Sequence, residues 1–495
     1  MTVTASTALY TAAQVRALDD AFIASGVPAI NLMKRAGRAA FEALLQHWGE
    51  VDEITVYAGA GNNAGDGFVL AALAAARRIP VNVILVGDSE KLTGAAKVAF
   101  DYARQEGVIM MPPGPAPSSG VIVDGLLGTG ISGEVRPEYR RVIEQINASG
   151  LPVLALDLPS GLNADTGAEL GLAINATVTV TFIGQKRGLY TGRGPALAGE
   201  VIFDDLGAPV EIYNAVDPEA VSLPFMQMRQ WLPEREADAH KGHFGHVMVI
   251  GGDTGRGGAA IMAAEAAART GAGLVSLATR PEHVTAMLAR CPEVMACGVI
   301  SGQELEPWLS GPTVLVVGPG LGQSPWSEQM LQQALNSGLP LVLDADALNL
   351  LATGRLNANL PRENWVLTPH PGEAARLLDT PTADVQTNRF AAITRLQQAF
   401  GGAVILKGAG SLVAAAIDPL TLINAGNPGM ATGGMGDILS GVVGALLAQG
   451  LSPYQAAALG AALHAYAADL GAADRGEASL LATDLLPYVG ELLSA

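Results

Sequence analysis

Apolar residues recur with helical spacing in the first fifty positions of the chain. Between residues 11 and 25, Val15, Leu18 and Phe22 fall on one helical face, and the pattern stops at Gly26-Val-Pro28. A second apolar face extends from about Asn31 to Leu45. The pattern therefore predicts two amphipathic helices before the first strand.

Short apolar runs and helical patterns then alternate along the whole chain, which is typical of α/β proteins with parallel sheets. The first half is expected to form a Rossmann-like parallel sheet with flanking helices, and the second half an α/β sandwich. Strands are predicted at 54–58, 81–86, 121–124, 153–157, 178–182, 246–250, 274–278, 313–318, 339–344, 365–368 and 403–406, and helices at 68–77, 259–269 and from 438 onward.

A chain of 495 residues is too long for one hydrophobic core. The segment 207–235 contains four prolines and little periodicity, so it is interpreted as a linker with the entry to a second domain. We therefore expect two domains, 1–215 and 216–495.

Polar and glycine-rich segments follow several predicted strands of the first half. The turn Gly59–Gly67 links a strand to a helix, and Asp124 and Asp157 each end a strand. In an open parallel sheet such residues meet at the edge where ligands bind. A polar turn and ordinary helix caps are the alternative interpretation.

In the second half, Gly433-Gly-Met-Gly436-Asp437 precedes a long apolar run that predicts a buried helix. Glycines leave backbone N–H groups free to surround an anion, the helix N-terminus adds positive charge, and Asp437 is placed to act as a base. The pattern favours phosphoryl transfer to an alcohol. The alternative is a glycine-rich turn that caps an ordinary helix, which would have the same sequence pattern. A P-loop motif is absent from the sequence.

Composition narrows the choice of partners and compartment. A net charge of −18 argues against binding to nucleic acid or an anionic membrane. Cys291 and Cys297 are too few for a disulfide framework and are expected to be reduced core residues. Without an apparent leader or an uninterrupted 18-residue apolar span, the chain is expected to be soluble and cytoplasmic. His240, His243 and His246 are not expected to bind metal, because the intervening glycines disfavour the helix that would align them.

The first half resembles the YjeF N-terminal family through Asn62-Asn-Ala-Gly-Asp66, Gly128-Thr-Gly-Ile-Ser-Gly-Glu134 and Asp157-Leu-Pro-Ser160. The resemblance implies an epimerase of hydrated NADH and NADPH, with Asp157 as acid/base and potassium held by Asn63, Asp124 and Ser160. Ala64 stands where the family usually has glycine. The implied substrate contacts are Asn62, Asn63, Ala64, Gly65, Asp66, Gly128, Thr129, Gly130, Ile131, Ser132, Gly133, Glu134, Tyr139 and Asp157.

The second half resembles the YjeF C-terminal family, the ribokinase-like dehydratases of hydrated NAD(P)H. The matching motifs are Lys241-Gly, Gly318-Pro-Gly-Leu-Gly322, Asp344-Ala-Asp-Ala-Leu-Asn349, Thr368-Pro-His-Pro-Gly-Glu373, Lys407-Gly and Gly433–Asp437. The resemblance implies ADP as phosphoryl donor, as in bacterial members, and magnesium ordered by Glu373 through water. Implied substrate contacts are Ala260, Gly320, His370 and Asp437, and implied nucleotide contacts are Lys407, Gly408, Ala409, Gly410, Ser411 and Gly436.

The expected activity is therefore repair of the hydrated cofactors NADHX and NADPHX, by epimerisation in one domain and ADP-dependent dehydration in the other. The alternative is a vitamin kinase of the hydroxymethylpyrimidine type, joined to a non-catalytic binding module. A homo-oligomer is compatible with the sequence, which does not specify the number of subunits.

Overall fold

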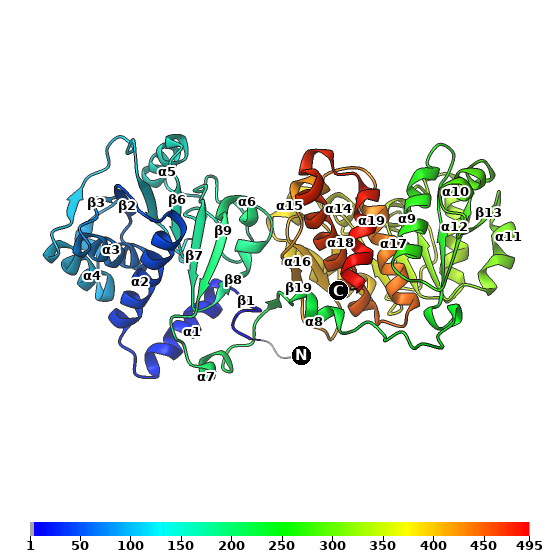
Figure 1. Cartoon of the computed structure of the whole chain (residues 1–495), viewed down its shortest axis with the longest axis horizontal. Coiled ribbons are helices and arrows are strands. Elements are labelled where there is room, and N and C mark those ends of the chain that lie inside the picture. The colour runs from blue at the N-terminus through cyan, green and yellow to red at the C-terminus, as the bar shows by residue number, and fades with distance from the viewer. Residues whose placement is uncertain (1–3, 132, 495) are drawn as a thin grey trace. The chain divides into compact units, whose positions relative to one another are not determined.

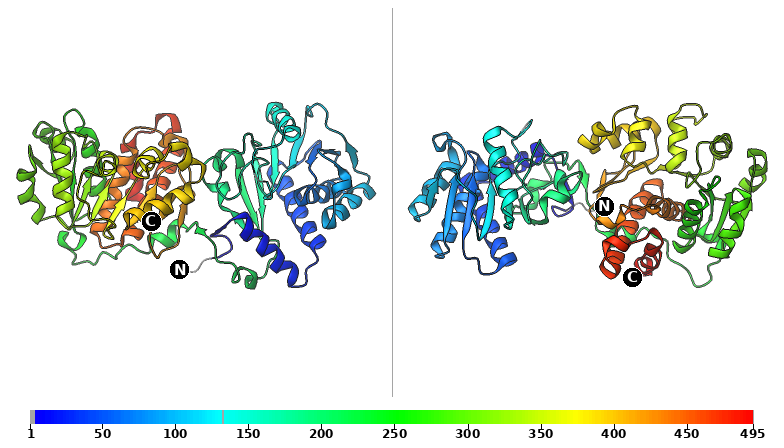
Figure 2. Two further views of the ribbon diagram at one scale, coloured as in Figure 1. Left: turned by 180° about the vertical axis from the view of Figure 1, so that it is seen from behind. Right: turned by 90° about the horizontal axis from the view of Figure 1, so that it is seen from above.

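The computed structural model describes residues 4–131 and 133–494, so Ser132 of the expected substrate loop lies outside the described residues. The chain divides into two compact units, Met1–Val221 and Ser222–Ala495 (Figure 1). Each unit is an α/β structure with helices on both faces of a sheet, as Figures 1 and 2 show. The α/β fold class expected from the sequence is confirmed for both halves.

The first unit is built on seven parallel strands in the order β4-β3-β2-β5-β6-β7-β9. A short β1 (Ala8–Tyr10) pairs with β8 (Gln185–Lys186) and β10 (Ala220–Val221). The seven strands are β2 (Ile54–Ala58), β3 (Val81–Leu85), β4 (Ile109–Met111), β5 (Val121–Gly125), β6 (Val153–Leu156), β7 (Val178–Phe182) and β9 (Glu200–Asp204). The helices are α1 (Ala12–Ala24), α2 (Ala29–Trp48), α3 (Asn62–Ala76), α4 (Gly94–Gln105), α5 (Pro137–Ser149), α6 (Gly194–Ala198) and α7 (Val210–Tyr213).

The strand order of this sheet reverses between β2 and β5. Because crossover connections are right-handed, the helices that follow the two strands pack on opposite faces. Alternate residues of β2 show this, since Val56 belongs to the core under α2, α3 and α4, whereas Tyr57 belongs to the core under α5. The reversal leaves a crevice at the carboxyl ends of β2 and β5.

The helix α3 begins at Asn62, so the expected turn up to Gly67 is wrong. The turn ends at Gly61, which caps the helix with an extended backbone. The later glycines serve close packing instead, because a Cβ on Gly65 would lie 2.5 Å from the sulfur of Met33. The motif Asn62–Asp66 is consequently the first turn of a helix, with its polar side chains beside the crevice.

The second unit has the strand order β13-β12-β11-β14-β15-β16-β17-β18-β19, parallel except for β18, which is antiparallel to both of its neighbours. The strands are β11 (His246–Ile250), β12 (Leu274–Thr279), β13 (Met295–Gly298), β14 (Val314–Val317), β15 (Leu341–Leu343), β16 (Trp365–Leu367), β17 (Ala403–Leu406), β18 (Ser411–Ala414) and β19 (Thr421–Ile423). The helices are α8 (Phe225–Arg229), α9 (Gly257–Arg269), α10 (Val284–Arg290), α11 (Gly302–Leu305), α12 (Pro325–Asn336), α13 (Ala345–Ala352), α14 (Pro371–Leu377), α15 (Thr382–Thr387), α16 (Arg389–Phe400), α17 (Met435–Ala448), α18 (Pro453–Arg475) and α19 (Leu485–Ser494).

The helix α17 occupies the centre of this unit. Every residue from Ile438 to Leu447 is buried, which confirms the predicted buried helix. Its glycines permit close approach, since a Cβ on Gly441 would lie 2.1 Å from the carbonyl oxygen of Ala263 in α9. The helix begins at Met435, three residues before the expected start, so Gly436 and Asp437 belong to its first turn.

Two further sequence expectations concern the thiols and membrane spans. Cys291 and Cys297 are free and buried, as predicted. Across residues 4–131 and 133–494, none of the helices combines the length and apolar character that crossing a membrane requires.

Candidate active sites

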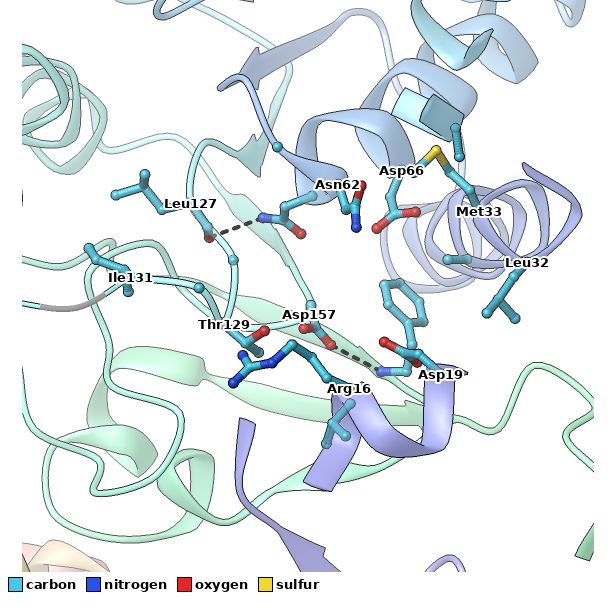
Figure 3. Close-up of a pocket in the computed structure, with 18 of the residues that line it drawn as sticks. Arg16, Asp19, Leu32, Met33, Asn62, Asp66, Leu127, Thr129, Ile131 and Asp157 are labelled. Atoms are coloured by element: carbon cyan, nitrogen blue, oxygen red, sulfur yellow. Dashed lines mark hydrogen bonds between the residues drawn. The ribbon is translucent and has the colours of Figure 1, made fainter. Parts of the chain in front are cut away.

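A cavity of about 970 Å³ lies at the carboxyl edge of the first sheet, where the strand order reverses (Figure 3). The structure brings most of the sequence-predicted substrate residues to its wall, namely Asn62, Asn63, Asp66, Gly128, Thr129, Gly130, Ile131, Glu134, Tyr139 and Asp157. Ala64 and Gly65 are buried in the body of α3. Gly133, with φ 78°, turns the loop after β5 without contributing to that wall.

The loop after β5 and the first turn of α3 approach closely beside this cavity. The Asn63 side-chain nitrogen donates to the Leu127 carbonyl oxygen at 3.1 Å, and a Cβ on Gly128 would lie 3.3 Å from the Asn63 Cβ. A Cβ on Gly59 would lie only 2.0 Å from the Leu126 carbonyl oxygen, so glycine is required at the end of β2. These contacts fix the strand-end loops against each other.

The three residues implied as potassium ligands lie together behind this wall. The Ser160 hydroxyl donates to Asp124 Oδ1 at 2.6 Å and contacts the Leu127 carbonyl oxygen at 3.2 Å, while the Ser160 N–H donates to Asp124 Oδ2 at 2.8 Å. Burial raises the pKa of Asp124 to about 6. Among the described residues, the buried side-chain oxygen of Asn63 has no hydrogen-bond partner. Such an oxygen, close to the buried carboxyl group of Asp124, suits a hard cation held by oxygen ligands.

Asp157, at the end of β6, is paired with a lysine that the sequence analysis did not identify. Lys186 in β8 is 1% exposed, and its ammonium donates to the carboxylate of Asp157, the dashed line from Asp157 in Figure 3. Asp157 itself adopts a left-handed backbone with φ 66°, which turns its side chain toward the cavity. The pair is separated by 29 residues in the sequence, and no local motif joins them.

The helix α1 also contributes ionisable residues to the cavity that the sequence analysis missed. Arg16 and Asp19 lie on its wall (Figure 3). A signal for Asp19 was present, because it follows Val15 by four positions and precedes Phe22 by three, which places a carboxyl on the predicted inward face. A charged residue at such a position usually has a specific role.

In the second unit, the first turn of α17 meets the ends of β15 and β17. A Cβ on Gly436 would lie 3.2 Å from Lys407 Nζ and 3.5 Å from Asp344 Oδ2, so only glycine leaves this space open. Lys407 donates to Asp344 Oδ1 at 2.8 Å, and the Thr368 hydroxyl donates to the same oxygen at 2.8 Å. Asp437 lies in the same turn as Gly436. A partly buried lysine paired with a buried aspartate thus lies beside a glycine-bearing helix N-terminus, a place suited to anions.

Negative charge is in excess around Lys407. Burial, with Asp344 and Glu373 nearby, raises the pKa of Asp437 to about 7. Burial also raises the pKa of Glu373, whose Oε2 lies 3.9 Å from Lys407 Nζ and accepts from the His370 N–H at 2.8 Å. Three carboxyl groups therefore share one ammonium, and a bound cation would compensate the remaining charge.

The other predicted dehydratase residues also lie at strand ends of this sheet. Gly320, with φ 60°, follows β14, and a Cβ there would lie 2.3 Å from the Arg256 carbonyl oxygen. Ala260 is fully buried in α9, beside the glycines that end β11. His370 caps α14 by accepting from the Gly372 N–H at 3.0 Å.

The predicted nucleotide-binding residues Lys407, Gly408, Ala409, Gly410 and Ser411 join β17 to β18. Arg389, which the sequence analysis missed, is 1% exposed and supports this hairpin from α16. Its guanidinium donates to the carbonyl oxygens of Leu406 at 3.1 Å, of Lys407 at 3.2 Å and of Gly410 at 3.4 Å. This buried cation therefore holds the carbonyl groups of the loop in place.

Comparison with known proteins assigns both halves. A family model described as NAD(P)H-hydrate dehydratase matches residues 247–490, and one described as YjeF-related protein N-terminus matches residues 29–188. A ribokinase-like superfamily protein from Enterococcus faecalis, covered over 96% of its chain and 56% of this one, has 30% identity and a TM-score of 0.51. The ribokinase-like fold expected for the second half is thereby confirmed.

Two curated relatives span nearly the whole chain. The bifunctional NAD(P)H-hydrate repair enzyme of Coxiella burnetii is 50% identical over 490 residues, which cover 99% of this chain and 100% of the relative. The enzyme of the same name from Escherichia coli is 43% identical over 471 residues, which cover 95% of this chain and 90% of the relative. The chain therefore belongs to the family of bifunctional NAD(P)H-hydrate repair enzymes.

Proposed function

We propose that the first unit interconverts the R and S epimers of NADHX and NADPHX, and that the second unit dehydrates the S epimer with ADP. One observation carries the proposal: Asp437, Gly436, Lys407 and Asp344 converge at the N-terminus of α17, as phosphoryl transfer to an alcohol requires. The full-length relatives favour this function over the alternative of a vitamin kinase with a binding module.

The dehydratase reaction removes a hydroxyl group from C6 of the hydrated nicotinamide ring. Hydroxide is a poor leaving group, so the hydroxyl is first phosphorylated. Asp437 accepts the hydroxyl proton while the oxygen attacks the β-phosphoryl group of ADP and releases AMP. The lone pair of ring nitrogen N1 then expels phosphate, and loss of a C5 proton gives NAD(P)H. A pKa of about 7 suits Asp437 to this task, because it can be deprotonated at neutral pH and still accept a proton.

We assign Lys407 and the Gly408–Ser411 loop to the nucleotide phosphates, with Gly436 at the transferring group. Ala260, Gly320 and His370 are assigned to the hydrated nicotinamide. Within the described residues, no group of three or more His, Cys, Asp and Glu side chains is arranged to hold a metal ion unaided. Glu373 would therefore hold magnesium through water, together with the nucleotide. When bound, the ion offsets charge on the transferring phosphoryl group.

In the first unit, Asp157 is assigned to proton transfer at the C6 hydroxyl, and the helix α3 and the loop 128–134 to binding the substrate. Asn63, Asp124 and Ser160 would hold potassium behind the cavity wall. The ion would fix the Leu127–Gly128 segment against α3, because the carbonyl oxygen of Leu127 shares this cluster. Its contribution is to shape the binding site.

The first prediction concerns the phosphoryl donor. Racemic NADHX, magnesium and purified protein are mixed with ADP or with ATP, and reduced-nicotinamide absorbance is followed. We expect NADH to form at a higher rate with ADP, with AMP and phosphate as the other products. Equal or faster turnover with ATP would refute the donor assignment. A stable phosphorylated substrate without NADH would instead favour the kinase.

A second prediction concerns Asp437. Asp437→Asn keeps the shape of the side chain but removes the base, so the dehydration rate should fall by about 10²–10⁴-fold. Epimerisation, measured by chromatography of a single epimer, should persist. Because burial disfavours the Asp437 carboxylate, the asparagine should not lower the melting temperature. Asp384→Asn, at an exposed position of α15, is the matched control and should leave dehydration unchanged. A dehydration rate within threefold of the native rate would contradict the assignment.

The third prediction separates the two cations. Exchanging potassium for tetramethylammonium should slow epimerisation and leave dehydration of the pure S epimer unaffected. Asn63→Leu, which removes the buried oxygen, should make epimerisation insensitive to potassium. If the native protein epimerises at the same rate after potassium is exchanged for tetramethylammonium, the cluster of Asn63, Asp124 and Ser160 does not bind the ion.

A further inference from the structure

Four of the ionisable groups on the wall of the epimerase cavity come from four different elements. They are Asp19 of α1, Asp66 of α3, Asp157 after β6 and Lys186 of β8. In Figure 3 the carboxyl groups of Asp19 and Asp157 point toward the same space, with Asp66 above them. This set has three carboxyl groups and one ammonium, and the exposed guanidinium of Arg16 lies on the same wall.

Lys186 neutralises Asp157 in preference to the other two. Its ammonium has three N–H donors. It donates to Asp157 Oδ1, to the Thr181 hydroxyl at 3.2 Å and to the Phe182 carbonyl oxygen at 3.0 Å. All three donors are thus engaged, and Asp157 is the carboxyl group in direct contact with the ammonium.

The surroundings of Asp19 favour its protonated form. Burial raises the pKa of Asp19 to about 7; among the charged groups facing it, Lys186 and Arg16 lower this pKa, and Asp157 and Asp20 raise it. Burial, together with Asp157 and Asp19, raises the pKa of Asp66 well above its usual value. A carboxyl group paired with an ammonium and a carboxyl group whose pKa burial raises to about 7 thus face one cavity. Such separation is the pattern of a base with its acid.

We propose that Asp19 is a second catalytic group of the epimerase half, which donates a proton to the substrate while Asp157 accepts one. This assignment rests on the epimerase activity proposed above. Both groups are needed because inversion at C6 must break one bond to that carbon and form it again on the other face.

A ring-opening mechanism balances all protons and bonds in this inversion. Asp157 takes the proton of the C6 hydroxyl, the C6=O bond forms, the N1–C6 bond breaks, and its electron pair on N1 takes the proton of Asp19. After the aldehyde group rotates and presents its opposite face, N1 attacks that face of C6. The N1 proton then returns to Asp19, and the oxygen regains its proton from Asp157. The substrate is inverted, and both carboxyl groups recover their starting states.

The test uses the full-length protein and one purified epimer of NADHX, without ADP or magnesium, and follows interconversion by chromatography. Asp19→Asn is isosteric with the neutral acid but cannot donate its proton, so interconversion should fall by about 10²–10⁴-fold. Asp101→Asn, in α4 at the surface ion pair with Lys97, is the matched control and should stay within about twofold. Dehydration of the S epimer by the same preparation verifies its concentration and the integrity of the second unit.

A pH profile distinguishes a proton donor from a residue that only supports the fold. The native interconversion rate should fall as pH rises through about 7, because Asp19 then loses the proton that it must donate. Asp19→Glu keeps a carboxyl group and should recover part of the rate that Asp19→Asn loses. If Asp19→Asn does not fold, the pH profile of the native protein tests the proposal. A native interconversion rate that stays constant between pH 6 and 9 overturns it.

Different results would contradict the epimerase activity and the role of Asp19. No interconversion by the native protein would contradict the epimerase activity itself. Native interconversion with an Asp19→Asn rate within threefold would contradict only the role of Asp19.

Discussion

Charge buried away from water is costly unless it is paired, and this constraint organises both sites. Each unit pairs one lysine at a strand end with one aspartate, the buried Lys186 with Asp157 and the partly buried Lys407 with Asp344. The lysine makes its shortest contact with this partner, so its charge compensates the remaining carboxyl groups of each site less directly. Burial then raises the pKa of one of them, Asp19 or Asp437, to about 7. Each site consequently contains a lysine-paired aspartate and a carboxyl group whose pKa lies near neutral pH.

These pairs can form only where strands end close together. In both sheets the strand order reverses, between β2 and β5 in one and between β11 and β14 in the other, so successive helices leave a crevice at that point. Glycine permits the close approach at each reversal, since a Cβ on Gly59 or Gly251 would lie 2.0 Å from a carbonyl oxygen of the neighbouring loop. The same geometry therefore supports two different reactions. In the function proposed here, the crevice of the first unit would admit a substrate whose C6 must be reached from both faces, whereas the N-terminus of α17 in the second unit would face a transferring phosphoryl group.

The sequence predicted the α/β class, the strands at 54–58, 178–182 and 246–250 and the buried helix because these depend on local apolar patterns. It placed the starts of α3 and α17 too late, because Gly65 and Gly436 occur inside helices to allow close packing or to leave space for a ligand, which a single sequence does not distinguish from a turn. Resemblance supplied the residues that lie within motifs. Lys186 and Arg389 were missed, because their partners lie far away in the sequence and tertiary contacts alone define them. Asp19 was missed although its spacing from Val15 and Phe22 placed it on the inward face of the predicted helix.

The central claim is that two independent carboxylate centres on one chain act in succession on one substrate. It is tested most directly by mixing two full-length variants, Asp157→Asn and Asp437→Asn, with racemic NADHX, magnesium and ADP. Alone, Asp157→Asn should give rapid NADH formation from one epimer only, with a break near half conversion, and Asp437→Asn should give almost none. An equimolar mixture should convert the whole racemate in a single phase, because the epimer made by one protein is released to the other. A progress curve of the mixture that still shows a break near half conversion would contradict this claim.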